Sequence, residues 1–439
     1  MHMLLDLFKE FAKKKGIAGN TYIVGGAVRD MLSGLETKDI DLVVPGDALE
    51  ISKEFAQATG SSFVLLDSEF GIARVVKESV FLDISAMKGE SITADLAGRD
   101  ITINAMAQPL CEWQSTLHVI DPFGGKEDLQ SGVIRMVSER NLVSDPLRIL
   151  RIYRFSAAMH ADIEINTRRA LNPHRALLDA VAIERIADEL RHLMELTDSY
   201  ESMKDMEEDY IMPVLFPEFL TAPGVSIKKG LACYGQCEAV LGDPAHYFPL
   251  HEERILDYFE LPARQICLKL TALFSGETNA LEAALRLKMS KKEAALIASI
   301  SSGCKNILSF CSLAAHRSEM LRFLKNVQDD IYPMVILAVA AGQKDQGPSG
   351  SSTPETPDPG DRVLSFCNKI LSLYVDEVLP RMGILRMITG DDLIREFYLP
   401  PSPQFKLILS ELEDDILEGK VNTKDEALKT VRDILARGV

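Results

Sequence analysis

The chain has 439 residues, enough for two to four domains, and its 46% hydrophobic and 26% charged residues are ordinary for a globular protein. Acidic residues outnumber basic ones, 65 to 48, which gives a formal net charge of −17. Such a charge argues against a nucleic-acid binder, because phosphate contacts need Lys and Arg. An RNA enzyme of this composition must therefore concentrate its basic groups locally.

Cysteine usage and hydropathy predict the compartment. The seven cysteines are scattered, and the closest pair, Cys233 and Cys237, lacks a second half for a zinc site. We expect free, buried thiols in a reducing environment. We also expect no signal peptide, and no run of about 18 apolar residues that could span a membrane. These features predict a soluble cytoplasmic protein.

The first predicted elements form a strand–turn–helix–strand unit. An amphipathic helix is predicted over residues 1–15. An apolar strand at 22–24 then runs into the pair Gly25-Gly26, a short helix follows over 27–35, and a second apolar strand begins at 39–44. The glycines let the backbone approach a polyphosphate, and N–H groups at the start of the next helix favour anions.

Two carboxylates open the second strand. Strand residues alternate sides, so Asp39 and Asp41 point the same way, one pleat apart. Carboxylates held side by side repel each other unless a cation lies between them, and Mg²⁺ prefers a few carboxylate oxygens together with substrate phosphates. A metal site and a phosphate cradle in one unit predict nucleotidyl transfer. The alternative is a surface turn followed by a solvated strand end.

The string GGAVRD that begins at Gly25, followed by DID from Asp39, resembles a known head domain. It is that of the class II tRNA nucleotidyltransferase and bacterial poly(A) polymerase family, within the polymerase-β-like superfamily. The resemblance implies that Asp39 and Asp41 are catalytic and hold two Mg²⁺ ions. It also implies that the triphosphate of ATP or CTP is bound by Gly25, Gly26 and Arg29.

A helix is predicted over 48–59, and three short strands over 63–66, 73–76 and 80–84. The last strand contains one acid, Asp83, among apolar residues, and a buried lone carboxylate needs a cation or a metal. Enzymes of this superfamily often take a third catalytic carboxylate from the strand beside the DxD strand, so the resemblance makes Asp83 the candidate. The alternative is an edge-strand acid that faces water.

The stretch GRDITINAMA that begins at Gly98 resembles the family's RRDxxxN motif, with Gly98 in place of the first Arg. If the stretch is helical, Asp100 and Asn104 share a face. The resemblance implies that Arg99, Asp100 and Asn104 bind the nucleotide, and that the carboxylate and the amide bond to the ribose 2′-hydroxyl. The alternative is a helix N-terminus with Asp100 as its cap.

Residues 120–129 form a predicted Gly-rich loop that leads into a helix and resembles the family's third motif, to which we assign a positional role. Another helix is predicted from Asp145. Arg148, Arg151 and Arg154 are spaced by three, so they form a basic strip along one face of this helix. The strip is one place where positive charge collects.

The resemblance gives this strip a role. In the family, an EDxxR motif reads the incoming base, because its Asp and Arg bond to the base edge in place of a template. Asp145 and Arg148 match the motif, whereas Ser144 stands at the usual Glu. An Arg fork can pair with a carboxylate and still offer donors to a base. A purely structural Asp–Arg pair is the alternative. The implied nucleotide-binding residues here are Asp145, Arg148, Arg151 and Arg154.

Beyond the strip the chain is predicted to be mostly helical. Residues 183–190 resemble the family's next neck helix, ERIxxEL, which we interpret as scaffold. Some members have a phosphohydrolase domain with an adjacent His-Asp pair, but the corresponding stretch here, 268–276, ends in Ser-Gly. His246 and His251 are expected at the surface, so no second active site is predicted.

Residues 343–362 are rich in Gly, Pro, Ser and Thr without an apolar period, so a disordered linker is predicted. The helical segment after it resembles the family's tail, which binds the tRNA elbow. The predicted domains are a catalytic head (1–140), a neck with base-recognition helices (141–200), a helical body (201–342), a linker (343–362) and a tail (363–439).

The predicted fold class is α+β, with a polymerase-β-like head followed by an all-α neck, body and tail. The predicted function is template-independent transfer of CMP, AMP or both from CTP and ATP to the 3′ end of tRNA. Mg²⁺ is the predicted cofactor, and no membrane or protein partner is predicted. Poly(A) polymerase and a non-catalytic RNA-binding module are the alternatives.

The connection from Asp83 to Gly98 bears on which nucleotides are added. It consists of little more than residues 85–97. The family's complete CCA-adding enzymes use a longer flexible segment here to switch from CTP to ATP. The short connection favours a partial enzyme that adds only CC or only A.

Overall fold

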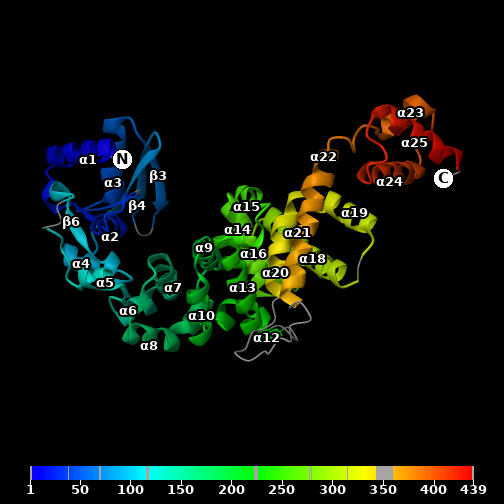
Figure 1. Cartoon of the computed structure of the whole chain (residues 1–439). Coiled ribbons are helices and arrows are strands. Elements are labelled where there is room, and N and C mark those ends of the chain that lie inside the picture. Colours follow the sequence, from blue (N-terminus) through cyan, green and yellow to red (C-terminus); the bar gives the residue numbers. More distant parts are fainter. Residues whose placement is uncertain are drawn as a thin grey trace. The chain divides into compact units, whose positions relative to one another are not determined.

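The computed structural model describes residues 2–37, 39–68, 71–114, 118–221, 226–275, 277, 279–313, 315–342 and 359–437. The chain divides into two compact units, Met1–Leu215 and Phe216–Val439, whose elements are labelled in Figure 1. The first unit contains a six-stranded sheet with helices, and the second is helical throughout its described part. The predicted α+β class is confirmed.

The sheet of the first unit has the strand order β3-β4-β5-β2-β1-β6. The strands β2 and β5 run parallel, and every other neighbouring pair is antiparallel, so the sheet is mixed. The strands are β1 (Tyr22–Val24), β2 (Ile40–Val44), β3 (Ser62–Asp67), β4 (Ile72–Lys77), β5 (Val80–Ala86) and β6 (Ala107–Pro109). The strands predicted from the sequence are confirmed within two residues at each end.

Helices cover both faces of this sheet. On one face, Phe8 of α1 (His2–Lys15) meets Phe55 of α3 (Ala48–Thr59) edge to face, with ring centroids 4.9 Å apart. Leu42 of β2 joins their core, whereas Val43 packs on the other face with α4 (Ile92–Ala97). Because strand residues alternate sides, Asp41 lies on the α4 face with Val43. The sheet thus places this carboxylate away from the main apolar core.

The other elements of the first unit connect and extend this sheet. They are η1 (Ala18–Asn20), α2 (Gly26–Leu32), η2 (Thr102–Asn104), η3 (Leu110–Glu112), α5 (Gly125–Ser131), β7 (Val133–Ile134), α6 (Glu139–Ser144), α7 (Arg148–Met159), β8 (Asp162–Ile163), α8 (Ile165–His174), η4 (Arg175–Ala180), α9 (Ile183–Met194), α10 (Tyr200–Glu208) and α11 (Met212–Leu215).

Two local predictions need correction. Asp39 lies one residue before β2 and is not part of the strand. The stretch from Gly98 is not an α-helix: Ile101 forms a β-bridge with Met136, and only a short 3₁₀ turn, η2, follows. Asp100 therefore caps no α-helix and shares no helical face with later residues. Its backbone is engaged in a long-range pairing that local periodicity does not reveal.

The Gly-rich loop before α5, to which a positional role was assigned, is held in place by Asp121. The carboxylate of Asp121 accepts hydrogen bonds from the backbone N–H groups of Gly125 and Lys126, at 2.7 and 2.9 Å. A Cβ on Gly125 would lie 2.3 Å from the carbonyl oxygen of Thr102, so only glycine fits there. The loop thus fixes α5 against η2, which follows Asp100.

The second unit is built from helices, and their bounds are α12 (Glu218–Thr221), α13 (Ile227–Gly242), α14 (Pro244–Tyr247), α15 (Glu252–Phe259), α16 (Pro262–Leu273), α17 (Asn279–Arg286), α18 (Lys291–Leu313), α19 (Arg317–Val327), η5 (Gln328–Asp330), α20 (Ile331–Gly342), α21 (Pro359–Leu373), the π-helical η6 (Tyr374–Val378), α22 (Leu379–Arg381), α23 (Gly390–Phe397), α24 (Gln404–Leu417) and α25 (Lys424–Ala436).

The core of this unit contains a buried ion pair. Lys269 of α16 is fully buried, and its Nζ lies 2.5 Å from Oε1 of Glu238 on α13. The helix α18, which packs against α16 and α20, is the one described helix long and apolar enough by length and composition to cross a membrane. No such segment was expected from the sequence, but a helix in a protein core passes the same test.

His251 is buried, which corrects the prediction that it lies at the surface. Its Nε2 lies 3.2 Å from the hydroxyl of Ser372, whereas His246 is exposed as expected. The predicted linker, 343–362, lies outside the described residues up to 358, and its last four residues already belong to α21. A separate apolar core joins α23, α24 and α25.

Candidate active site

The DxD strand brings two carboxylates together on one face of the sheet. In the parallel pairing of β2 with β5, Asp41 lies directly beside Asp83, and Asp39 is exposed just before the strand. Burial raises the pKa of Asp41, and the neighbouring charges of Asp83 and Asp39 act in the same direction, against Arg99. The charged form of Asp41 is therefore disfavoured by its burial and by two neighbouring carboxylates.

Asp83 is held by an arginine of the next strand. Arg74 donates from Nε and Nη2 to the two carboxylate oxygens of Asp83, at 2.7 and 2.8 Å. The guanidinium of Arg74 also lies 3.8 Å from the ring centroid of Phe81. Asp83 thus lies on an inner strand of the sheet, between β4 and β2, and both of its oxygens have a cationic partner.

The Gly25 turn brings the backbone against this charged group. Gly25 has φ +70° and ψ −134°, a conformation that L residues rarely adopt. A Cβ there would lie 3.0 Å from Nη1 of Arg99 and 3.6 Å from Oδ2 of Asp41. The backbone conformation therefore favours glycine, and a larger residue would also displace the guanidinium of Arg99 by a few tenths of an ångström.

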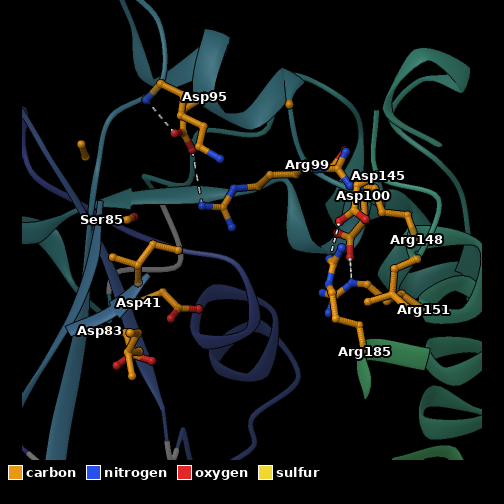
Figure 2. A pocket seen from close by; sticks show the side chains of 16 residues that line it. Asp41, Asp83, Ser85, Asp95, Arg99, Asp100, Asp145, Arg148, Arg151 and Arg185 are labelled. Carbon is orange, nitrogen blue, oxygen red and sulfur yellow. Dashed lines mark hydrogen bonds and ion pairs between the residues drawn. The ribbon is translucent and has the colours of Figure 1, made fainter. Parts of the chain in front are cut away.

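Two further predicted residues connect the turn with the second motif. Arg29 of α2 donates from Nη1 to Oδ1 of the buried Asn104, at 2.8 Å, and from Nε to Asp30, at 2.9 Å. Arg99 reaches Asp95 with Nη2 at 3.4 Å, while its buried Nε has no hydrogen-bond partner among the described residues. Figure 2 shows the guanidinium of Arg99 extended toward the sheet that bears Asp41.

Asp100 is buried, and its carboxylate already accepts hydrogen bonds from within the protein. It accepts hydrogen bonds from Nε of Arg151, at 2.8 Å, and from the backbone N–H of Ile101, at 2.9 Å. Burial alone would raise the pKa of Asp100, but the charge and hydrogen bond of Arg151 outweigh it and hold the pKa below its usual range. Asp100 is therefore ionised at neutral pH.

The basic strip of α7 exists, but most of its charge is paired. Arg151 also donates to Glu189 of α9, at 3.3 Å, and Arg154 donates to the same carboxylate at 2.6 Å. Both guanidinium groups lie near the ring of Phe155, at 5.4 and 4.3 Å from its centroid. Within the part of the chain that the structure describes, Arg148 bonds to a backbone carbonyl and to no carboxylate, so the strip is less basic than predicted.

The predicted base-reading residues do not bond to each other. Arg148 donates to the carbonyl oxygen of Arg99 at 3.3 Å. Asp145 accepts from Nη2 of Arg185, at 3.0 Å on Oδ2, while no described residue bonds to its buried Oδ1. The interpretation of Asp145 and Arg148 as a purely structural ion pair is therefore wrong. Burial, together with Arg151 and Arg99, lowers the pKa of Arg148.

Two neighbouring cavities of about 510 and 530 Å³ collect the predicted residues. Asp41, Arg99, Asp100 and Arg151 line both cavities. The larger one is otherwise lined, among the predicted residues, by Gly25, Gly26, Arg29, Asp39, Asn104 and Arg154. The other, shown in Figure 2, is lined by Asp83, Asp145 and Arg148. Every predicted site residue thus lies at one of the two, although their individual roles stay predictions.

Three charged residues of this site, Arg74, Arg185 and Glu189, were not predicted from the sequence. Arg185 and Glu189 belong to the ERIADEL segment that was interpreted as scaffold. They are four residues apart on α9, so they lie on one helical face, and α9 packs against α7. That spacing was the available signal. Arg74, in an ordinary strand, gave none.

The chain is similar in sequence and in fold to known proteins. Residues 21–135 match the family model of the poly A polymerase head domain, and residues 162–222 match that of the probable RNA and SrmB-binding site of polymerase A. A CC-adding tRNA nucleotidyltransferase of Synechocystis sp. is 29% identical over 416 residues, which cover 94% of this chain and 93% of that protein.

These matches make the chain similar to the class II tRNA nucleotidyltransferase and bacterial poly(A) polymerase family. Another relative, an A-adding tRNA nucleotidyltransferase of Halalkalibacterium halodurans, is 29% identical over 449 residues, which cover 98% of this chain and 92% of that protein. The family fold extends over nearly the whole chain: a Thermotoga maritima CCA-adding enzyme complexed with tRNA matches with a TM-score of 0.70 and 24% identity, covering 99% of this chain and 95% of that one.

Proposed function

We propose that this chain transfers CMP, AMP or both from CTP and ATP to the 3′ end of tRNA. The observation that supports this most directly is the position of Asp41, with Asp83 on the adjacent strand and the Gly25 turn within contact distance. Two relatives that span nearly the whole chain are named for CC and A addition to tRNA. In the proposed reaction, the 3′-hydroxyl of the RNA attacks the α-phosphate and pyrophosphate leaves.

The donor set fits Mg²⁺ bound together with substrate. No group of three or more His, Cys, Asp or Glu side chains is arranged as a metal site within the described ranges. Mg²⁺ usually takes one or two carboxylates plus phosphate oxygens, and Asp39 and Asp41 supply those two. The raised pKa of Asp41 indicates a carboxylate that a dication would stabilise. When bound, Mg²⁺ would lower the pKa of the attacking hydroxyl and stabilise the leaving oxygen.

The protein's own side chains bind and orient the nucleotide in this proposal. Gly25, Gly26 and Arg29 contact the triphosphate. Asp100 accepts two hydrogen bonds in the structure, and a carboxylate has lone pairs for about two more, so it can also accept one from the ribose 2′-hydroxyl. Asn104, held by Arg29 at 2.8 Å, lies at the same cavity and completes the ribose contact.

Asp145 and Arg148 select the base. Oδ1 of Asp145 is a buried acceptor to which no described residue donates. Cytosine and adenine both present an exocyclic amine, which donates a hydrogen bond, beside a ring nitrogen that accepts one from an arginine. Uracil and guanine present a carbonyl at the position of the amine, and an oxygen facing an unpaired acceptor is disfavoured. The arrangement supports CTP and ATP over UTP and GTP.

The proposal also covers the connection at 85–97, the neck and the tail. The short connection at 85–97 supports a partial enzyme, which adds only CC or only A. The neck at 141–200 supplies the base-reading residues. The acidic tail at 363–439, whose helices α23 to α25 have their own apolar core, contacts the tRNA.

The test is incorporation by the full chain with Mg²⁺ and each nucleoside triphosphate singly. The tRNAs end at the discriminator base, at C or at CC. CMP added to the first two RNAs identifies a CC-adding enzyme, and one AMP added to the CC end identifies an A-adding enzyme. Both activities together identify a complete CCA-adding enzyme and refute the inference from the short connection. Long A tails on any RNA identify a poly(A) polymerase, and no incorporation at all refutes nucleotidyl transfer and favours an RNA-binding module.

A further inference from the structure

We infer that Arg185 is a positioning residue that orients Asp145 for base selection. This inference rests on the proposed function, because it concerns the residue that would read the base. It assigns a role to a side chain of α9, in the segment interpreted as scaffold. Three observations support it: the partners of Asp145, the position of Arg148 and the exposure of Arg185.

The contact joins segments that are distant in the sequence. Asp145 lies between α6 and α7, and Arg185 comes from the first turn of α9. Nη2 of Arg185 donates to Oδ2 of Asp145 at 3.0 Å, while Oδ1 of the same carboxylate is buried with no partner in the described part of the chain. Figure 2 shows the guanidinium of Arg185 reaching Asp145 at the cavity wall. One oxygen is thus held and the other is left for a ligand.

The pairing of Arg185 with Asp145 also affects which acceptor Arg148 bonds to. Asp145 and Arg148 are close enough for their charges to interact, yet Arg148 donates to the carbonyl oxygen of Arg99 instead. Because Oδ2 of Asp145 already has a cationic partner, the carboxylate need not rotate to capture Arg148. The remaining donors of Arg148 stay available to a base edge. By pairing with Asp145, Arg185 therefore prevents Asp145 and Arg148, the two proposed base-reading residues, from bonding to each other.

The exposure of Arg185 separates this role from a stabilising one. Its side chain is 53% exposed, and ion pairs in such positions contribute little to folding stability. Arg185 adds little to the fold, but it fixes one oxygen of a carboxylate whose other oxygen has no partner among the described residues. It therefore acts on the ligand that Asp145 meets at the cavity, which this residue lines. The geometry thus predicts an effect on base choice without an effect on unfolding.

The experiment compares Arg185→Gln and Arg185→Lys with the wild-type full chain in single-turnover incorporation. The measured quantity is kcat/KM for the accepted nucleotide divided by that for its carbonyl counterpart, CTP against UTP or ATP against GTP. Loss of the charge should reduce this ratio about 10- to 100-fold, the range expected for one charged hydrogen bond. The lysine variant, which keeps the charge, should recover part of the ratio.

Arg169→Gln is the matched control, because Arg169 is an exposed arginine on α8 of the same unit and lines neither cavity. Its ratio should equal that of the wild type, and the thermal unfolding temperatures of all three variants should stay near the wild-type value. A second series in the Asp145→Ala background tests the route of action. If Arg185 acts through Asp145, Arg185→Gln should change the ratio no further there.

Three results would overturn the inference. They are an unchanged ratio in Arg185→Gln, an equal fall in kcat/KM for both nucleotides, and the same loss of discrimination with and without Asp145. Failure of the proposed function has a different signature, because the wild-type protein would then incorporate no nucleotide, and that result would overturn both proposals together.

Discussion

Replacing Gly25 by alanine tests whether the glycine turn sets the geometry of the site. The backbone there has φ +70° and ψ −134°, so any L residue should cost about 1–3 kcal/mol of conformational strain. For a unit of this size, each kcal/mol lowers the unfolding temperature by about 2–4 °C. The added Cβ would lie 3.0 Å from Nη1 of Arg99 and 3.6 Å from Oδ2 of Asp41, so Arg99 must move.

The effect on transfer should exceed the effect on stability. A displacement of about 1 Å in a catalytic constellation can reduce the rate about 100-fold, and Gly25→Ala should show a loss of that order in single-turnover transfer at saturating nucleotide. Gly34→Ala is the matched control, because Gly34 has the same φ of +70°, but a Cβ added there would have no atom of a described residue within 4 Å. It should lose some stability and keep the wild-type rate. Equal transfer rates in the two variants would refute the role assigned to the turn.

Three further predictions concern charged groups. Asp41→Ala should abolish transfer and leave the unfolding temperature equal or higher, because the raised pKa of Asp41 shows that its charged form is disfavoured in the folded state. Asp100→Asn should destabilise the protein at pH 7 by about 1–3 kcal/mol in urea unfolding, because Arg151 loses the nearer of its two charged acceptors and keeps only Glu189. Since the folded pKa of Asp100 is lowered, this difference from the wild type should disappear as the pH falls through and below the usual aspartate range. Lys269→Met should destabilise the second unit by about 3–5 kcal/mol, because Glu238 stays buried and loses its cationic partner.

Each of these has a result that contradicts it. Transfer retained by Asp41→Ala would exclude the DxD carboxylates from catalysis. A stability difference for Asp100→Asn that persists at low pH would show that the ionised form of Asp100 is not what stabilises the fold. Lys305→Met removes a comparable pair with Glu277 in which both side chains are 52% exposed, so it should change stability little. Equal losses at Lys269 and Lys305 would contradict the reasoning from burial.

The sequence predicted what depends on local pattern. The strand at Tyr22–Val24, the glycine turn and the helix at Ala48–Thr59 follow from apolar period and turn chemistry, and the structure has them. The position of Asp83 beside Asp41 depends on strand order, which composition does not encode, and it was predicted only through the family resemblance. The resemblance likewise gathered Asp145 and Arg148 into the site.

The failures share a physical cause, which is a partner far along the chain. Asp100 was assigned to a possible helix, but Ile101 bridges to Met136 and so prevents one. A structural pair of Asp145 with Arg148, three residues on, was the alternative to base reading, but Asp145 pairs with Arg185, 40 residues away. In each case a contact with a residue distant in the sequence replaces the helix or ion pair that the neighbouring residues would allow. Spacing along one segment cannot reveal such a choice.

The contacts that tie the stretch 97–100 to α6 and α7 have a consequence for recombining this chain with its relatives. Asn141 donates to the carbonyl oxygens of Ala97 and Arg99, at 2.8 and 2.7 Å, and Arg151 donates to Asp100. A chimera joined between the sheet and α6 that brings other residues to these positions would break these bonds, and it would leave acceptors on one side of the junction without these donors. A junction placed after α9 would transfer the carboxylates, the base reader and Arg185 as one block. Exchange of nucleotide preference between members should therefore succeed with that longer segment and fail with the sheet alone.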